Sequence, residues 1–235
     1  MCYNATHMKK IQDEPHIQFA VLAADVVIFT VREGKLLARL SNVNRPPFFD
    51  NIPGFPGGLI KPEETAEEAV KRIIEEKALI KTKIYFEQFY TFSEVNRDPR
   101  GRVVSVGYVA FIPWEKLSEE EQSGNDDLWW SEGKNIKALA YDHTFVFKKA
   151  LEYLHTRLKS TTIVFKLLPD LFTLTTLENT LQILLNEKID KRNFRKKIAK
   201  IKILKASKEK TKGMKHRPAQ LYTTKTDEVF EASLF

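Results

Sequence analysis

The sequence predicts an α+β protein with two domains, and three observations lead to this prediction. The first ~140 of the 235 residues alternate strand and helix patterns, whereas the remainder is mainly helical. Charge is divided in the same way: residues 141–235 hold 20 Lys/Arg against 10 Asp/Glu, and the rest holds 18 against 21. Hydrophobic content of 43% and charged content of 29% are typical of a globular chain. We therefore expect a neutral-to-acidic domain over residues 16–140, joined to a basic domain over residues 141–226.

The first domain is expected to contain four strands and one helix. The strands are predicted at 20–31, 35–40, 84–92 and 103–112. The first is rich in Val and Ile, and the last has the β-branched and aromatic composition of a strand. A helix is predicted over 65–77, where Thr65 is a suitable N-cap and Ala69, Ile73 and Ile74 mark an apolar side. The segment "NIPGFPGGLIKPEE" before it is expected to be a turn-rich loop. In this loop Gly57 and Gly58 allow the backbone to approach a ligand closely.

The second domain begins with an amphipathic helix predicted over 141–160, with Asp142 as candidate cap. Its apolar stripe comprises Phe147, Leu151, Leu154 and Leu158. After a break at Pro169, a second helix is predicted over 173–187. Its cap is either Thr173 or a capping box of Thr175 with Glu178.

A third helix, over 189–201, begins after the candidate cap Asp190 and places Phe194, Ile198 and Ile201 inward. Two strands, at 201–210 and 219–225, follow it and flank a basic loop. Two helices in tandem, the second of them basic, followed by a basic hairpin, indicate a winged helix-turn-helix. In that fold the third helix enters the DNA major groove and the wing follows the backbone or the minor groove.

Basic residues are dense on these DNA-facing elements, with 14 basic against 2 acidic residues in 188–217. A solvated lysine-rich face is the simpler interpretation, but the density and placement favour contact with double-stranded DNA. The candidate DNA-binding residues are Lys191, Arg192, Asn193, Arg195, Lys196 and Lys200 in the helix, with Lys212, Lys215 and Arg217 in the wing.

The loop and helix at 57–80 resemble the Nudix box of pyrophosphate-cleaving hydrolases, G-x5-E-x7-R-E-U-x-E-E-x-G-U. The matching residues are Gly58, Glu64, Arg72, Ile74, Glu76 and Ile80, and the departures are Ile73, Lys77 and Leu79. The resemblance implies an α/β/α sandwich for the first domain. "NIPGFPGG" and "NRDPRGRVVSV" also resemble members that handle ADP-ribose. An ordinary charged amphipathic helix is the alternative, and the glycine pair and the Glu64/Arg72 spacing argue against it.

Positions 73, 76 and 77 share one helix face, where the family's glutamates hold magnesium. Here only Glu76 is a carboxylate, Ile73 offers no ligand, and Lys77 places a positive charge where the ion belongs. We therefore expect no metal, no cofactor, no catalytic residue and at most weak hydrolysis. Lys77 either replaces the ion as an electrostatic partner of a ligand or points into water.

The candidate ligand-binding residues combine this region with the arginine-rich turn that follows the third predicted strand. They are Gly57, Gly58, Glu76, Lys77, Arg97, Arg100 and Arg102. For the three arginines, anion binding and a solvated turn around Pro99 and Gly101 stay equal alternatives. His143 is expected to be structural rather than a ligand or catalyst.

"LLPDLFTL", "DKRNFRKKI" and "RPAQLY" resemble the C-terminal domain of Nudix-related transcriptional regulators. That resemblance implies a homodimeric repressor on a palindromic operator. Its effector would be ADP-ribose or a related NAD-pathway metabolite, or a sugar such as arabinose. The alternative is an active Nudix hydrolase with a nucleic-acid tether, whereas a structural or RNA-associated module has no support beyond charge.

The location in the cell is expected to be the cytoplasm. The most apolar stretch, 17–31, is shorter than a membrane span and contains Asp25, and the N-terminus lacks the apolar core of a signal peptide. A single cysteine, Cys2, excludes an intrachain disulfide and a cysteine-based zinc cluster. We expect no membrane partner.

Overall fold

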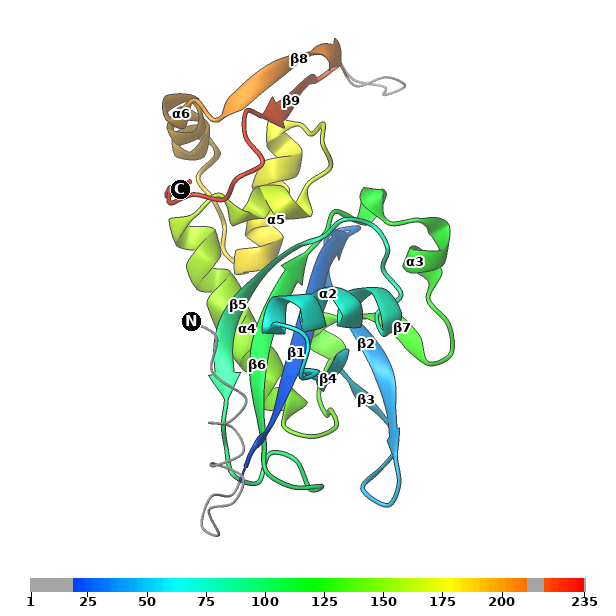
Figure 1. The fold of residues 1–235 in the computed structure, drawn as a ribbon. Coiled ribbons are helices and arrows are strands. Elements are labelled where there is room, and N and C mark those ends of the chain that lie inside the picture. Colours follow the sequence, from blue (N-terminus) through cyan, green and yellow to red (C-terminus); the bar gives the residue numbers. More distant parts are fainter. Residues whose placement is uncertain (1–18, 211–217, 235) are drawn as a thin grey trace.

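The computed structural model describes residues 19–210 and 218–234, so Lys212, Lys215 and Arg217 of the predicted wing lie outside the described residues. A mixed sheet forms the centre of the first domain, with helix α2 on one face and helix α4 on the other (Figure 1). The winged-helix elements gather at the far end of α4. None of the helices in these described ranges combines the length and the apolar composition needed to cross a bilayer.

The sheet has the strand order β3-β2-β1-β6-β5. The central strand β1 (Val21–Arg32) pairs antiparallel with β2 (Lys35–Arg45) and parallel with β6 (Val103–Phe111), which is paired with β5 (Tyr85–Phe92). Residues 23–30 of β1 are buried, because both faces of this strand are covered. The four strands predicted from sequence are confirmed, with β2 five residues longer than expected.

Part of the segment predicted as a turn-rich loop is strand, so that prediction was wrong over seven residues, 51–54 and 57–59. Strands β3 (Phe49–Gly54) and β4 (Gly57–Leu59) pair with β2 and β1. Proline and glycine lower strand propensity, but the hydrogen bonds to neighbouring strands outweigh it here. Four further elements were not predicted from the sequence. They are strand β7 (Leu128–Glu132) and the short helices η1 (Trp114–Lys116), α3 (Glu119–Ser123) and η2 (Gly133–Asn135).

Helix α2 (Ala66–Glu76) confirms the predicted helix and its cap. The hydroxyl of Thr65 accepts from the backbone N–H of Glu68, whose carboxylate accepts from the N–H of Thr65 in return. Its buried residues, among them Ile73 and Ile74, pack against one face of β1. This packing fixes the direction in which the last turn, and so Lys77, approaches the rest of the domain.

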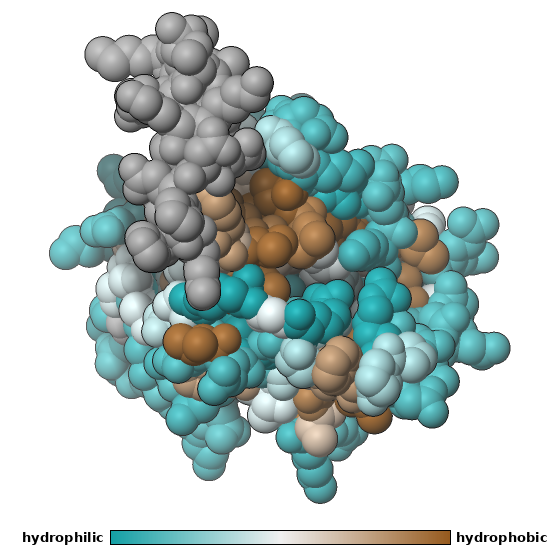
Figure 2. Space-filling model, turned by 60° about the horizontal axis from the view of Figure 1, so that its bottom comes forward, coloured by the Kyte–Doolittle hydropathy of each residue, from teal (hydrophilic) through white to brown (hydrophobic). Residues whose placement is uncertain are grey.

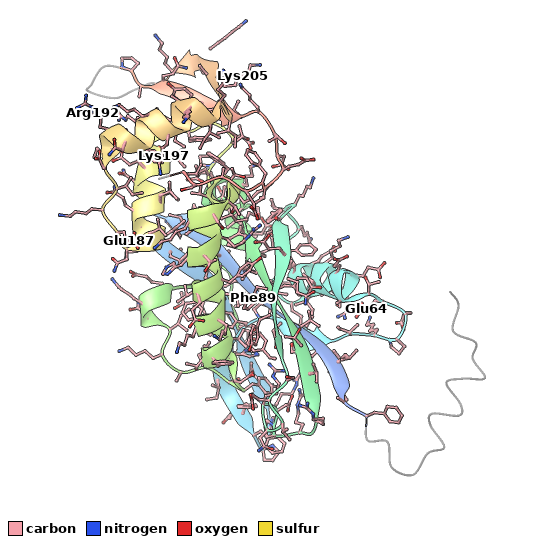
Figure 3. The ribbon with its side chains drawn as sticks, turned by 90° about the vertical axis from the view of Figure 1, so that its left-hand side faces the viewer. Glu64, Phe89, Glu187, Arg192, Lys197 and Lys205 are labelled. Carbon is pink, nitrogen blue, oxygen red and sulfur yellow. The ribbon has the colours of Figure 1, made fainter. Side chains whose placement is uncertain are left out.

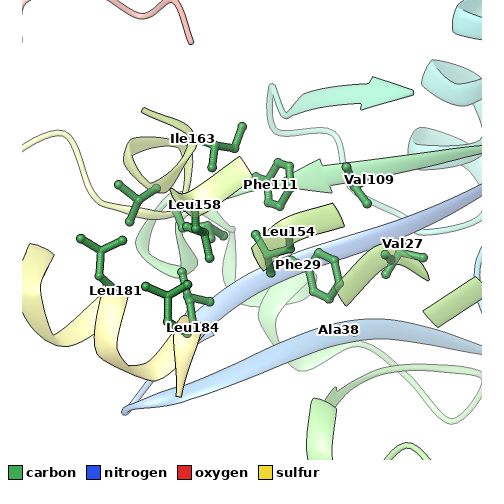
Figure 4. Packing of buried hydrophobic residues seen from close by; sticks show 14 of the residues in the cluster. Val27, Phe29, Ala38, Val109, Phe111, Leu154, Leu158, Ile163, Leu181 and Leu184 are labelled. Carbon is green, nitrogen blue, oxygen red and sulfur yellow. The ribbon is translucent and has the colours of Figure 1, made fainter. Parts of the chain in front are cut away.

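Helix α4 (His143–Ser160) covers the other face of the sheet. Leu154 and Leu158 lie between Phe29 on the sheet side and Leu181 on the side of α5 (Leu174–Leu185) (Figure 4). All four side chains belong to one buried cluster, which therefore runs from the sheet into the second domain. The predicted boundary at residues 140/141 stays a prediction, since α4 contributes to both cores.

The second domain consists of η3 (Ile163–Leu167), α5, α6 (Lys191–Ile201), β8 (Leu204–Lys210) and β9 (Gln220–Thr224). Strands β8 and β9 form an antiparallel ribbon, and Phe172 bridges to Tyr222 at its inner edge. Thr173 caps α5 through the N–H of Thr176, so the alternative capping box at Thr175 is not used; Glu178 is instead buried. The order of elements confirms the predicted winged helix-turn-helix.

Replacing Leu158 by alanine tests whether the two domains share one core. Removing this fully buried side chain leaves a cavity, which costs about 2–5 kcal/mol of folding free energy in such positions. We expect denaturant midpoints followed by tryptophan fluorescence and by far-ultraviolet circular dichroism to fall together. All three tryptophans lie in the first domain, whereas circular dichroism also follows α5 and α6.

Lys148→Ala, at an exposed position of the same helix, is the control and should leave both midpoints unchanged. A tryptophan midpoint that stays at its original value in Leu158→Ala, while the circular dichroism midpoint falls, would show two independent cores.

Candidate functional site

A cavity of about 510 Å³ opens where β1, β2, β4 and the end of α2 meet the turn at 97–100 and the start of α4. This volume is within the range of pockets that bind small molecules. Of the candidate ligand-binding residues, the cavity wall includes Gly57, Gly58, Glu76, Lys77, Arg97 and Arg100. It does not include Arg102, whose guanidinium donates to the carbonyls of Ser93 (2.9 Å) and Glu94 (3.2 Å).

Gly57 of β4 is sterically required. A Cβ on Gly57 would lie 2.2 Å from Oδ1 of the buried Asp25 and 3.2 Å from the carbonyl oxygen of Ala24. A Cβ on Gly58 would lie 2.8 Å from Nζ of Lys77, so a side chain there would displace only the flexible end of that lysine. Gly57 thus sets the width of the cavity at this point.

Lys77 is the C-cap residue of α2, and its ammonium group donates to the carbonyl oxygen of Gly57. Desolvation on the cavity side lowers the pKa of Lys77. The cations Arg45 and Arg72 lower it further, against Asp25 and Glu76, which raise it. Lys77 lines the cavity, where both cations and carboxylates lie near its ammonium group.

The residues at 73, 76 and 77 do not fit a divalent cation. Ile73 is fully buried in the α2 packing, and the Glu76 side chain is 62% exposed with its nearest cation, Arg72, 3.9 Å away. The ammonium of Lys77 holds the Gly57 carbonyl, an oxygen of the kind a hard cation would seek. In the described ranges, no group of three or more His, Cys, Asp or Glu side chains is arranged to hold a metal.

Glu64 and Arg72, which match the Nudix box, have a structural role in this chain. Nε of Arg72 donates to Glu64 (2.9 Å), Nη2 contacts the same carboxylate, and Nη2 also donates to the carbonyl of Leu59 (3.0 Å). This hydrogen bonding lowers the pKa of Glu64 to about 2. The pair fastens the loop after β4 to helix α2 and so holds the cavity wall in place.

Arg97 is neither a solvated turn residue nor simply an exposed anion binder. Its side chain is 4% exposed, and its Nε and Nη2 donate to both carboxylate oxygens of Asp142 at 2.9 and 2.7 Å. Nη2 also donates to Asp25 at 3.0 Å. Asp142 occupies the N-cap position of α4 as predicted, but it makes no capping hydrogen bond, because its carboxylate is engaged by Arg97.

Asp25 and His143 form the floor of the cavity beside Arg97. Burial would raise the pKa of the Asp25 carboxyl, but His143, Arg97 and the Ser105 hydroxyl (2.7 Å) together hold it well below its ordinary value. The backbone N–H of Phe55 donates to Nδ1 of His143, so the ring proton is on Nε2, 3.5 Å from Asp25. These contacts give His143 the structural role expected for it.

Arg100 lies at the mouth of the cavity and pairs with Asp98 at 3.0 and 2.7 Å. Its guanidinium carbon is also 5.4 Å from the ring centroid of Tyr141. Several cavity residues had no prediction as ligand contacts, among them Asp25, Arg45 and Tyr141. A charged residue inside the apolar run of β1 was a usable signal for Asp25, whereas nothing in the local sequence distinguishes Arg45.

The candidate DNA-binding surface is the outer side of α6 together with β8. Asp190 caps α6 by accepting from the N–H groups of Arg192 (2.9 Å) and Asn193 (3.2 Å), and the Asn193 amide also binds Asp190. Phe194 and Ile198 are buried, so the basic side chains face outward. Those exposed on α6 are Lys191, Arg192, Arg195, Lys196, Lys197 and Lys200.

Arg192 on α6 and Lys205 on β8 lie at the end of the molecule away from Glu64 (Figure 3). Lys197 of α6 and the exposed lysines of β8, Lys205, Lys208 and Lys210, had no prediction as DNA contacts. Lys191 forms an ion pair within the protein, since its Nζ lies 3.2 Å from the buried carboxylate of Glu178. The outer face is thus a continuous basic surface formed by a helix and a wing strand.

Two family descriptions match the chain: the NUDIX domain over residues 21–146 and the NrtR DNA-binding winged helix domain over residues 164–224. The ADPR responsive transcriptional repressor NtrR of Acinetobacter baylyi is 30% identical over 209 residues, which are 86% of this chain and 81% of that protein. An ADP-ribose pyrophosphatase of Methanocaldococcus jannaschii is 28% identical over 124 residues, which are 52% of this chain and 69% of that enzyme.

Among solved structures, Shewanella oneidensis NrtR complexed with a 27mer DNA superimposes with a TM-score of 0.78 at 29% identity, covering 87% of this chain and 93% of that one. The NUDIX domain of the same protein, complexed with ADP ribose, gives 0.52 at 27% identity, with coverage of 64% and 98%. Both domains and their order match. The chain belongs to the family of NrtR-type transcriptional regulators, in which a Nudix domain precedes a winged-helix DNA-binding domain.

Proposed function

We propose that this protein is a DNA-binding transcriptional repressor whose Nudix domain binds an ADP-ribose-like effector without cleaving it. The observation that carries the proposal is Lys77, a lysine ammonium placed where a hydrolase needs a metal ion, in a cavity built on the same core as a basic winged helix. The Acinetobacter baylyi relative, described as ADPR responsive, supports this assignment.

The charges of the cavity favour an anionic effector. Lys77 and Arg45 both line it, and neither forms an ion pair with an acidic side chain of the described residues. Two cations that repel each other in a partly desolvated site are stabilised by an anion placed between them. A diphosphate fits this requirement, and the ring of Tyr141 offers an apolar surface beside it. A neutral pentose would leave both cations without a partner, so the sugar is the second candidate.

The protein is proposed not to be an enzyme. Hydrolysis of a pyrophosphate needs a group that generates the nucleophile and neutralises the developing charge, and Glu76 alone supplies neither. The alternative is that the protein is a hydrolase of ADP-ribose. The similarity of the same domain to the Methanocaldococcus jannaschii pyrophosphatase is the reason to test it. A phosphate-release assay with ADP-ribose and magnesium distinguishes the two, and turnover comparable to that of a Nudix hydrolase would refute the proposal.

We further propose that the protein is a homodimer, that it binds a palindromic operator and that it acts in the cytoplasm. Apolar side chains gather on the face of the molecule shown in Figure 2, bordered by hydrophilic ones. Large apolar side chains are exposed just before β1, at its start and on β4, namely Phe19, Val21, Leu22 and Leu59. Exposed apolar groups of this size are typical of surfaces that contact another chain.

Neutralising Arg192 and Arg195 together is expected to weaken DNA binding strongly. Both side chains are exposed on α6, and an arginine that contacts a base or phosphate contributes about 1–3 kcal/mol. Binding is measured by gel-shift titration on a duplex that the wild-type protein selects from a random pool. Lys71→Ala with Lys148→Ala removes the same charge from exposed positions of the first domain and of α4, and serves as the control.

The control variant should retain affinity within about threefold. Equal affinities of the Arg192/Arg195 variant and the wild type would remove α6 from the DNA interface.

Lys77→Ala is expected to weaken ADP-ribose binding by about 1–3 kcal/mol, the scale for losing a charge-assisted hydrogen bond. Calorimetry is carried out in magnesium-free buffer with a chelator, because the proposal gives the role of the ion to the lysine. Lys71→Ala, which removes an exposed lysine from the same helix, is the matched control and should bind as the wild type does.

If ADP-ribose gives no heat while a pentose gives a clear isotherm, the sugar is the effector. Binding by the wild type that requires magnesium, or that Lys77→Ala does not change, would mean that Lys77 is an ordinary solvated lysine.

A further inference from the structure

Helix α4 begins at the cavity and ends in the winged-helix core. Tyr141 and His143, at its first turn, line the cavity, whereas Leu154 and Leu158 pack with Leu181 of α5. Its 18 residues extend roughly 27 Å at 1.5 Å per residue. Because a helix is stiff over this length, a displacement of its first turn is transmitted to the packing at its far end.

The first turn of α4 is held in place by a residue of another element. Asp142, at the N-cap position, makes no capping hydrogen bond, and its carboxylate is instead gripped at both oxygens by Arg97. Arg97 belongs to the turn after β5, and its Nη2 is shared with Asp25 of β1. One buried guanidinium therefore joins the sheet to the start of the helix.

Arg97 is also positioned to meet a ligand. Nε and Nη2 are the nitrogens that hold Asp142 and Asp25, and Nη1 has no hydrogen-bond partner among the described residues. Arg97 lines the same cavity as Lys77 and Arg45. A guanidinium that donates to two carboxylates on one side keeps donors free for an anion on the other.

We propose that Arg97 couples effector binding to DNA binding: an anionic group in the cavity binds Nη1 and draws the guanidinium toward it, and Asp142, held by Nε and Nη2, moves with it and shifts the first turn of α4. This inference rests on the proposed function and names the contact through which that function is regulated. The ligand then has different affinities for the two placements of α4, which is the condition for an effect on a distant site.

The test measures the coupling factor, which is the ratio of DNA dissociation constants with and without saturating ADP-ribose, at fixed salt. The key variant is Asp142→Asn, which keeps the size of the side chain but removes the charge that ties the first turn of α4 to Arg97. Asp142 is not part of the cavity wall, so ADP-ribose affinity and ligand-free DNA affinity should stay within about threefold of wild type.

The wild type is expected to show a coupling factor in the usual range of about 5–150. In Asp142→Asn the factor should fall to below about 2. Arg157→Gln is the control, since it breaks the other charged contact between α4 and the sheet, the bidentate pair with Glu87 at 3.0 Å. This variant loses an ion pair of comparable geometry and should keep the wild-type coupling factor.

A coupling factor in Asp142→Asn equal to that of the wild type overturns the inference and leaves the proposed function intact. Absence of ADP-ribose binding to the wild type refutes the proposed effector and the inference together. If Asp142→Asn fails to fold, Arg97→Lys decides the question, since lysine keeps the charge but has no fork to hold Asp142 and the ligand at once. A wild-type coupling factor in a folded Arg97→Lys protein would also overturn the inference.

Discussion

The packing of helix α4 against the sheet is the contact on which the rest of the structure depends. Phe29 of β1 and Leu154 of α4 belong to a buried cluster that continues to Leu181 of α5, so the sheet and the DNA-binding helices have one core. Each such side chain contributes roughly 1.5–3 kcal/mol by burial. The C-terminal segment of the chain returns to the last residue of α4, where the backbone N–H of Ala232 donates to the carbonyl oxygen of Ser160 at 2.8 Å. Linkage by a packed helix, unlike linkage by a flexible segment, allows one domain to bias the other.

The cavity at the opposite end of α4 is lined by the loop and helix of the Nudix box. It differs from a hydrolase site in its charge, because it contains the ammonium group of Lys77. A bound metal ion would bring two positive charges and an exchangeable water, whereas Lys77 brings one charge and no water that it can activate. In the proposed function, Lys77 attracts a pyrophosphate without supplying a nucleophile. Glu64 and Arg72 still fasten the loop to α2, which explains how the wall persists once the metal-binding glutamates are absent.

Local patterns predicted the elements that are determined locally. Capping at Thr65, Thr173 and Asp190, and the apolar periodicity of the long helices, follow from residues three or four apart. Strand β3 pairs with β2 at separations of only 4–13 residues, and it was missed because its Pro53 and Gly54 are typical of turns. Strand β4 was missed because its partners on β1 lie 32–36 residues away in the sequence. The role of Arg97 was missed for the same reason: Asp25 and Asp142 are brought to it by the sheet and by α4. Lys77 was found because its departure from a local motif was visible.

Amide hydrogen exchange of the full-length protein, with and without ADP-ribose in magnesium-free buffer, tests the central claim most directly. The claim is that a metal-independent ligand acts on the DNA-binding elements through α4. We expect ADP-ribose to change the protection of amides in the first turn of α4 and also in α5 and α6, which contribute no residue to the cavity wall. Changes confined to the segment 57–77 and the turn at 97–100 would contradict the account, because the ligand would then bind without reaching the second domain.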